Sequence, residues 1–309
     1  MNPTPPAAAG TSPTLPDAVA RVARSVVGIA GTRRGSASGC VWRQGVIVAP
    51  AHALWRAHGL RVVRPDGESA VAELKGLDSG TDLAALVVEG GAEMPAVERA
   101  ADGERRAGEF VFAVARDGSG LAHASFGHIG ATAGAWRSWR GGRIDRLIRL
   151  DGGLYPGFSG APVADASGQV IGIATSALSR VHGIVLPAST VDRVVSQLLA
   201  QGRVAHGWLG VALQPVRLPD AQVASLDIEP GPGLLVTSVA DDSPAAAAGM
   251  LLGDTLVALG GARITSIDAL RDSLGGDKIG ARLRAVVVRA GQRVELSIEI
   301  GERAPSRCG

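Results

Sequence analysis

Between residues 24 and 187 the chain consists of short apolar runs separated by glycine, proline or polar turns. We count about eleven such runs, among them residues 45–50 (GVIVAP), 83–90 and 169–178, without a long helical segment between them. The 43 glycines provide the positive φ values that tight turns require. This pattern is typical of a β-barrel or β-sandwich, and we therefore expect a mainly β fold here.

The chain is expected to hold two domains, since 309 residues of which 46% are hydrophobic can bury a sizeable core. The strand-rich region and the helix after it define the first domain, residues 15–203. Residues 207–303 combine strand-like runs with two short helical segments and predict a compact α+β domain. Residues 1–14, rich in Pro and Ala, are expected to be disordered, and residues 304–309 form a tail.

Two helices are expected at the ends of the first domain. Asp17 is placed to cap a short one near its start. A longer one connects to the second domain, with Ser189 or Thr190 at its start and Gly202 at its end.

Composition excludes several function classes. A net charge of +2 argues against a nucleic-acid or membrane-surface partner. Cys40 lies in an apolar run far from Cys308 and is expected to be a buried free thiol. No CxxC or Cys/His cluster is present, so neither a metal nor a cofactor is expected. The sequence has no apolar run of about 18 residues and no leader pattern, which predicts a cytoplasmic protein, or a periplasmic one if the N-terminus is incomplete.

The segment 136–149 (WRSWRGGRIDRLIR) contains two tryptophans and five arginines. Stacking and phosphate contacts would allow nucleic-acid binding. A solvated hairpin with an arginine stacked over a tryptophan is the simpler interpretation, and no nucleic-acid partner is expected.

Three polar residues stand where nucleophilic catalysis would need them. Ser159 lies between glycines in PGFSGAPV, His52 follows the apolar run 45–50, and Asp82 opens the run TDLAALVV. Each residue also has a purely structural interpretation. Ser159 could be a turn residue, His52 a histidine at a strand end, and Asp82 a turn residue or a cap. Their joint occurrence in the order His, Asp, Ser matches one known triad architecture. The backbone N–H groups of Gly157 and Ser159 are the expected oxyanion donors.

These stretches make the chain resemble the HtrA (high-temperature requirement) family of trypsin-like serine proteases. The matching motifs are GVIVAPAHAL, GTDLAALVV and PGFSGAPVADASGQVIGI, followed by GIVLP, GWLGVAL and SPAAAAGMLLGDTLVALGG. The resemblance implies a chymotrypsin-like double β-barrel followed by a small α+β PDZ domain, with His52, Asp82 and Ser159 as the triad.

The chain departs from the family's pattern near the serine. Phe158 and Ala161 stand where the family usually has Asn and a second Gly, and Pro50-Ala51 replaces Asn-Asn before the histidine. Residues 116–120 (RDGSG) replace the family's NPFG loop. Because the oxyanion donors are backbone groups, Phe158 is compatible with activity but is expected to change the packing of this loop.

Substrate-binding residues are expected on both sides of Ser159. Gly153 stands where a trypsin-like pocket would hold an acid, and Leu154 follows it. Ile184 and Val185 are expected to line the other wall, with an extended substrate pairing along residues 182–186. Cleavage after small or medium apolar residues is therefore expected.

In the second domain, residues 231–236 (GPGLLV) resemble the carboxylate-binding loop of PDZ domains. The expected peptide-binding residues are Gly233, Leu234, Leu235 and Val236. The helix after Ser266 would form the other side of the groove through Ile267, Leu270 and Leu274. The alternative is that some of these are core residues of a small domain.

The resemblance implies an ATP-independent endopeptidase that cleaves unfolded or exposed segments, binds peptide C-termini and forms a homotrimer. Two alternatives remain at this point. One is a catalytically silent relative that acts as a peptide-binding chaperone or scaffold, and the other is a hydrolase acting on a non-peptide ester.

Overall fold

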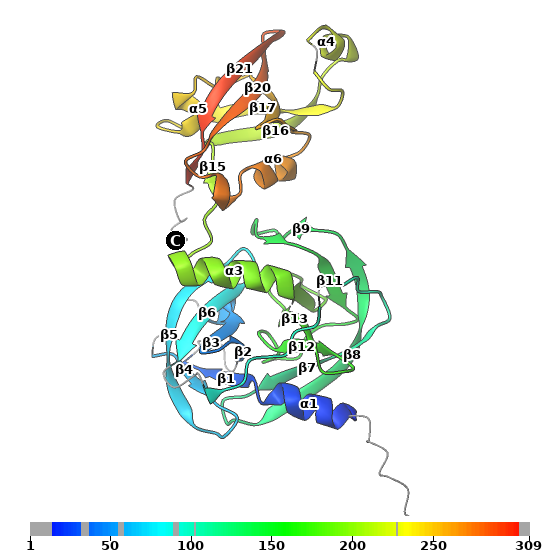
Figure 1. Cartoon of the computed structure of the whole chain (residues 1–309). Helices are drawn as coiled ribbons and strands as arrows, with labels where there is room; N and C mark the ends of the chain where they lie inside the picture. Colours follow the sequence, from blue (N-terminus) through cyan, green and yellow to red (C-terminus); the bar gives the residue numbers. More distant parts are fainter. Residues whose placement is uncertain are drawn as a thin grey trace, which may run out of the picture. The chain divides into compact units, whose positions relative to one another are not determined.

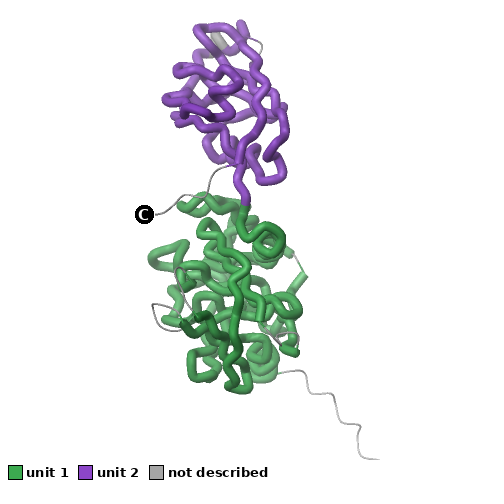
Figure 2. Tube along the Cα trace, turned by 90° about the vertical axis from the view of Figure 1, so that its left-hand side faces the viewer, with its two compact units in different colours: residues 1–204 green, residues 205–309 purple. Residues whose placement is uncertain are grey.

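The computed structural model describes residues 14–31, 37–54, 59–88, 93–101, 103–226 and 228–302. The chain divides into two compact units, residues 1–204 and 205–309 (Figures 1 and 2). The fold is mainly β, as predicted. The expected disordered N-terminus and the tail at 304–309 lie outside the described residues, except for Thr14.

The first unit consists of two closed antiparallel barrels. In the first barrel, the order around the barrel is β1-β2-β3-β6-β5-β4, and its strands are β1 (Val26–Ala30), β2 (Ala37–Arg43), β3 (Val46–Pro50), β4 (Arg61–Val63), β5 (Ser69–Asp78) and β6 (Leu83–Val88). In the second, the order is β11-β14-β13-β12-β7-β8, and its strands are β7 (Phe110–Arg116), β8 (Ala122–Ala133), β11 (Leu147–Leu150), β12 (Pro162–Asp165), β13 (Val170–Thr175) and β14 (Ile184–Pro187). A small hairpin of β9 (Trp136–Arg137) and β10 (Arg143–Ile144) extends from the second barrel.

Apolar side chains fill each barrel and the space between them. One cluster inside the first barrel includes Ile47 and Leu86, and one inside the second includes Ile148 and Val163. A third cluster joins strands of both barrels to helix α3 (Ala188–Gln201), which packs against both (Figure 1). Burial of this apolar surface is the main force that holds the barrels together.

Cys40 belongs to this shared cluster as a free, buried thiol, as predicted. Burial raises the pKa of its thiol, so it stays protonated and behaves as a small apolar side chain. Cys308 lies outside the described residues.

The two expected helices form, but their caps differ from the prediction. Helix α1 (Leu15–Ala23) is capped by Thr14, whose backbone N–H and hydroxyl both donate to the Asp17 carboxylate, at 2.9 and 2.6 Å. Helix α3 begins after Pro187, and Thr190 lies inside it with its hydroxyl donating to Asp145. Gly202, at φ 72°, ends α3 as predicted. A third, very short helix, α2 (Ala51–Leu54), follows β3 directly.

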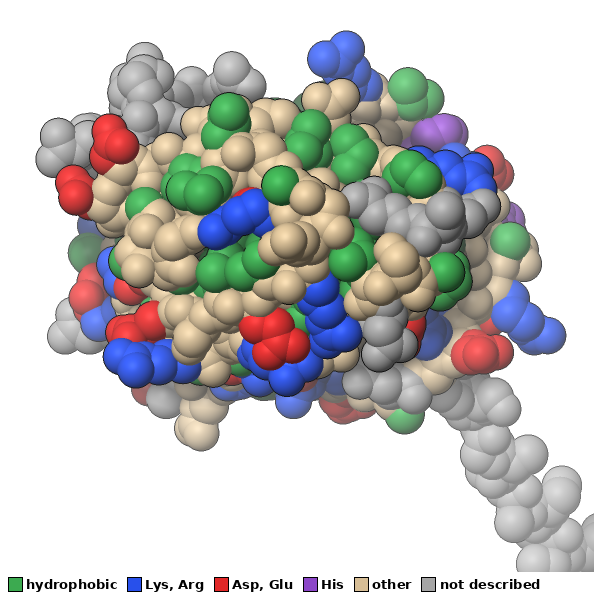
Figure 3. Space-filling view, turned by 90° about the horizontal axis from the view of Figure 1, so that it is seen from above, with side chains coloured by type: hydrophobic (Ala, Val, Ile, Leu, Met, Phe, Trp, Pro, Cys, Tyr) green, Lys and Arg blue, Asp and Glu red, His purple; other side chains and the backbone are tan. Residues whose placement is uncertain are grey.

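The second unit is built around an antiparallel sheet in the order β16-β17-β18-β20-β21. The strands of this sheet are β16 (Val211–Arg217), β17 (Pro232–Val239), β18 (Thr255–Leu259), β20 (Arg282–Arg289) and β21 (Gln292–Glu299). The short strand β19 (Ala262–Arg263) pairs with β18. Strand β15 (Gly207–Trp208) pairs separately with β22 (Gly301–Glu302). Its helices are α4 (Asp220–Ser225), α5 (Pro244–Ala247), α6 (Ile267–Ser273) and the 3₁₀ turn Gly276–Lys278. On the face that Figure 3 shows, acidic and basic side chains are interspersed, in keeping with the small net charge.

In the described part of the chain, no helix is long and apolar enough to cross a membrane.

In the second unit, the buried Asp254, just before β18, forms an ion pair with the partly exposed Arg289 at the end of β20. The side chain of Asp254 is 1% exposed and accepts two hydrogen bonds from Arg289 and one from the Leu251 amide, all at 2.8 Å. Burial alone raises the pKa of Asp254, but these hydrogen bonds outweigh it and hold the pKa below its usual value. The stabilisation is therefore complete above about pH 4 and is lost as the pH falls through the folded-state pKa.

We expect Asp254→Asn to reduce the free energy of unfolding of this unit by about 2 kcal/mol at pH 7, because the Arg289 charge loses its partner. Glu295→Gln is the control, since Glu295 is exposed and pairs with arginines in solvent; its cost is expected to stay below about 1 kcal/mol. Hydrogen exchange of residues 250–290 in the full chain measures both. Equal losses in the two variants, or a loss for Asp254→Asn that is the same at pH 3 and pH 7, would contradict this account.

Candidate active site

His52 and Asp82 lie together at the edge of the first barrel. His52 is in helix α2, directly after β3, and Asp82 directly precedes β6. His52 Nδ1 lies 2.8 Å from Asp82 Oδ2 and 3.0 Å from Oδ1. The His52 backbone N–H also donates to Asp82 Oδ1 at 2.8 Å. The carboxylate therefore fixes both the backbone and the ring of His52, and leaves Nε2 available.

Asp82 itself is held from both barrels. Its side chain is fully buried, and the Thr175 hydroxyl at the end of β13 donates to Oδ2 at 2.6 Å. Asp82 also has a φ of 61°, a left-handed conformation that costs about 1 kcal/mol or more in a non-glycine residue. Such strain persists only where the surroundings impose it, and here the hydrogen bonds around the carboxylate do so.

Ser159 lies in the loop between β11 and β12, and the first barrel supports this loop. Ser38 of β2 donates its hydroxyl to the Gly157 carbonyl at 2.8 Å, and its N–H donates to the Ser159 carbonyl at 3.2 Å. Gly160, at φ 87°, packs so closely that an added Cβ would lie 2.0 Å from the Ser38 carbonyl oxygen. The glycine after the serine is thus required by a close approach of the two barrels.

The amides of this loop fall into two groups. The N–H groups of Phe158, Gly160 and Ala161 all donate to carbonyls within the chain. Within the described residues, the N–H groups of Gly157 and Ser159 have no such acceptor. These two donors are the pair expected to receive an oxyanion, and Gly157 adopts a φ of 87° that glycine tolerates best. Phe158 packs into the core of the second barrel, which gives this departure from the family pattern a structural role.

The Ser159 hydroxyl faces Ser176. The two Oγ atoms are 2.9 Å apart, and the Ser176 N–H donates to Ser159 Oγ at 3.2 Å. Among the described residues, the partners of Ser159 Oγ do not include His52. The adjacent residues Thr175 and Ser176 thus contact Asp82 and Ser159 in turn, and among the described residues the Ser159 hydroxyl is hydrogen-bonded to Ser176 and not to His52.

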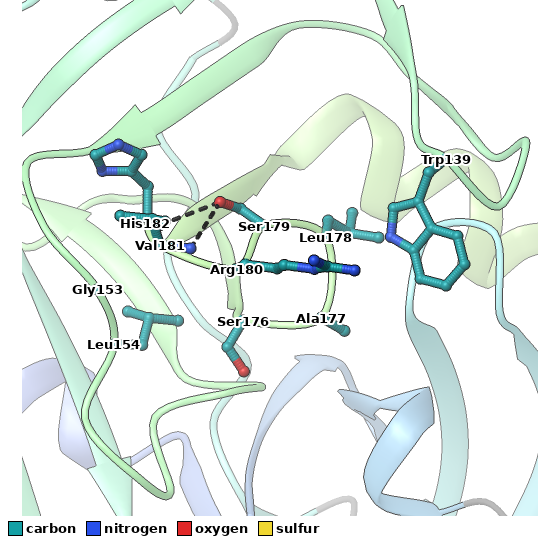
Figure 4. A pocket seen from close by; sticks show the side chains of 10 residues that line it. All are labelled: Trp139, Gly153, Leu154, Ser176, Ala177, Leu178, Ser179, Arg180, Val181 and His182. Atoms are coloured by element: carbon teal, nitrogen blue, oxygen red, sulfur yellow. Dashed lines mark hydrogen bonds between the residues drawn. The ribbon is translucent and has the colours of Figure 1, made fainter.

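A cavity of about 780 Å³ opens beside Ser176 (Figure 4). Gly153 and Leu154 line it, as expected, and the segment 176–182 forms much of its wall. Figure 4 shows Leu154 on one side, Trp139 on the other, and the Arg180 side chain extending toward Trp139. The lining contains no carboxylate, so the cavity suits an apolar side chain near its Leu154 side.

Two expected pocket residues are placed elsewhere. Ile184 and Val185 are buried within β14, which lies between β11 and β13. Both edges of β14 are already hydrogen-bonded, so the prediction that a substrate strand pairs along 182–186 is wrong. Thr175, Ser176 and Ser38 were missed by sequence reasoning. The hydroxyls that end the run VIGIATS were the available signal for the first two.

The expected peptide groove of the second unit also needs correction. Gly233, Leu234, Leu235 and Val236 lie in β17, which pairs with β16 on one side and β18 on the other. A peptide cannot add a strand there because both edges are occupied. Leu270 is 4% exposed and belongs to the core of the unit, with Ile267 partly buried beside it.

The arginine-rich segment forms the hairpin that the simpler interpretation predicted. The guanidinium carbon of Arg140 lies 4.5 Å from the centre of the Trp139 ring.

The fold and the site together have the architecture of a trypsin-like peptidase domain followed by a second, smaller domain. Residues 37–173 match the family model of the trypsin-like peptidase domain, and residues 207–300 match that of the PDZ domain. The chain belongs to the HtrA family of serine proteases.

Similar proteins support this assignment. A probable periplasmic serine endoprotease DegP-like from Chlamydia trachomatis serovar D is 30% identical over 273 residues, covering 84% of this chain and 52% of the relative. A protein of the same description from Brucella suis biovar 1 is 33% identical over 267 residues, covering 83% and 50%. The chain thus spans about half the length of these relatives. The solved structure of the HtrA-type protease AlgW with a decapeptide is 26% identical, with a TM-score of 0.79 over 94% of this chain and 99% of that one.

Proposed function

We propose that this protein is a serine endopeptidase that uses Ser159 as nucleophile, His52 as general base and Asp82 as the group that orients His52. The observation that carries the proposal is the fixed His52–Asp82 pair at 2.8 Å, together with a serine loop in which two amides have no backbone acceptor among the described residues. Family membership supports the same activity.

In the proposed mechanism, the Ser159 hydroxyl turns to His52 Nε2 and loses its proton to it while Oγ attacks the scissile carbonyl carbon. The Gly157 and Ser159 amides receive the oxyanion, a contribution of about 3 kcal/mol per donor. Imidazolium then protonates the leaving amine, and the peptide C–N bond breaks to leave an acyl-enzyme. Water, deprotonated by His52, hydrolyses the ester and restores Ser159.

Unfolded or exposed protein segments are the proposed substrates, cleaved after small or medium apolar residues without ATP. Leu154 and Gly153 in the cavity support this preference, since they supply an apolar wall without an acid. A periplasmic site of action is supported by the names of the relatives, and the homotrimer that the resemblance implies stays a prediction.

A fluorophosphonate probe and unfolded casein test the activity together. We expect the probe to form an adduct on Ser159 and casein to be degraded. Labelling with intact casein would instead favour an esterase, and intact casein without labelling would favour the silent chaperone.

For the second unit we propose binding of peptide C-termini at the free edge of β16, in place of β17. Among the described strands, β16 pairs only with β17, and its Val211 and Leu213 pack on the same apolar cluster as Ile267 of α6. In the segment before β16, the carbonyls of Leu209 and Gly210 accept hydrogen bonds. Among the described residues, the N–H groups of Leu209 and Gly210 donate to no backbone carbonyl, which suits capture of a carboxylate.

A fluorescent peptide with an apolar C-terminal residue tests this groove in the full chain. We expect amidation of its C-terminus, and separately Ile267→Asp, to weaken binding by about tenfold or more, because each removes one element of recognition. Leu252→Asp is the control, since Leu252 is exposed and precedes β18. Equal affinity for the free and amidated peptides would refute the carboxylate site.

A further inference from the structure

The Ser159 hydroxyl has two partners on one residue, Ser176. One is the Ser176 hydroxyl at 2.9 Å, and the other is the Ser176 N–H at 3.2 Å. Ser159 is 8% exposed, so little of the residue is in contact with solvent. Ser176 in contrast is exposed and lines the cavity shown in Figure 4.

The position of Ser176 is set by its neighbour Thr175. The Thr175 hydroxyl donates to the buried Asp82 carboxylate at 2.6 Å and accepts the Ala177 N–H at 3.0 Å. The backbone on both sides of Ser176 is therefore tied to the same carboxylate that orients His52. Ser176 is held beside the serine loop with little freedom to move away.

This arrangement opposes the first step of catalysis. A hydroxyl carries one hydrogen, and attack requires that this hydrogen point to His52 Nε2. If Ser159 donates to Ser176, its hydrogen is used there. If Ser176 donates to Ser159, it occupies a lone pair of the attacking oxygen. In the first case the hydrogen must leave Ser176 before it can point to His52, and in the second case one of the two lone pairs of the nucleophile is already engaged.

We propose that Ser176 is a positioning residue that holds the Ser159 hydroxyl in a resting hydrogen bond, which competes with the hydrogen bond to His52 that catalysis requires. The inference rests on the proposed catalytic role of Ser159. The Ser176 N–H contact remains in any side-chain variant, so the hydroxyl contributes one neutral hydrogen bond. Losing one such bond shifts the balance between these two hydrogen bonds of Ser159 about fivefold toward His52.

The test compares Ser176→Ala with the wild-type chain. We expect the second-order rate of fluorophosphonate labelling at Ser159, and kcat on a peptide substrate, to rise about fivefold, with KM changed less than about twofold. Ser176→Thr keeps a hydroxyl and is expected to label more slowly than Ser176→Ala. Ser69→Ala, at an exposed serine on β5, controls for serine loss in general.

The pH profile separates this role from a general disturbance of the site. Ser176 contacts Ser159 and not the imidazole, so its removal raises the plateau of the labelling rate without moving the midpoint that reports His52. A shifted midpoint would overturn the inference, as would equal or slower labelling of a folded Ser176→Ala chain. If neither chain is labelled at Ser159, the proposed function itself fails, which is a different result from equal labelling of both.

Discussion

Ser159→Ala is expected to reduce casein hydrolysis by about a hundredfold or more, because loss of the nucleophile disables residues that act as a unit. The fold should survive, since the Ser159 backbone carbonyl, which accepts the Ser38 N–H, remains in place. Turnover of casein and binding of the fluorophosphonate probe measure the loss.

The matched comparison is Ser176→Ala, which removes a hydroxyl 2.9 Å away and is expected to be at least as active as the wild-type chain. Casein turnover that is the same in the wild-type chain and Ser159→Ala would refute the mechanism.

Asp82→Asn is expected to lower kcat by about 10⁴-fold, because an amide can present its N–H to His52 Nδ1 and so favour the wrong tautomer of the ring. Because the asparagine amide has nearly the same size and shape as the Asp82 carboxylate, we expect the substitution to reduce kcat more than the stability of the fold. Steady-state kinetics on a peptide substrate give kcat and KM separately.

Asp192→Asn is the control for this substitution. Asp192 lies on α3 and accepts hydrogen bonds from Trp42, Arg43 and Arg99. None of these contacts involves His52. Its variant is expected to lose stability and keep kcat within about threefold. Equal losses of kcat in Asp82→Asn and Asp192→Asn would contradict the proposal that Asp82 orients His52.

Much of the proposed catalytic assignment was accessible from sequence. His52 and Asp82 could be selected because each stands at the end of an apolar run, where a strand leaves the core. Gly157 and Gly160 indicated a sharp turn around Ser159, and both do adopt positive φ. The HtrA resemblance joined these separate signals into one site.

The peptide-binding predictions failed for a shared reason. Residues 182–186 and 231–236 have the composition of strands that could accept a further strand, and most of each range does lie in a strand, β14 or β17. Whether a strand has a free edge depends on its neighbours, and those neighbours come from distant parts of the chain. β14 and β17 proved to be interior strands.

The sequence alone determined the strand-rich fold, because apolar periodicity and glycine placement act over a few neighbouring positions, and it also predicted two domains and the three polar residues of the proposed site. Only the tertiary structure decided which strand edges are free, that Thr175 and Ser38 support the site from opposite barrels, and that Ser159 faces Ser176. These are contacts between segments brought together when the barrels close, and no local pattern encodes them.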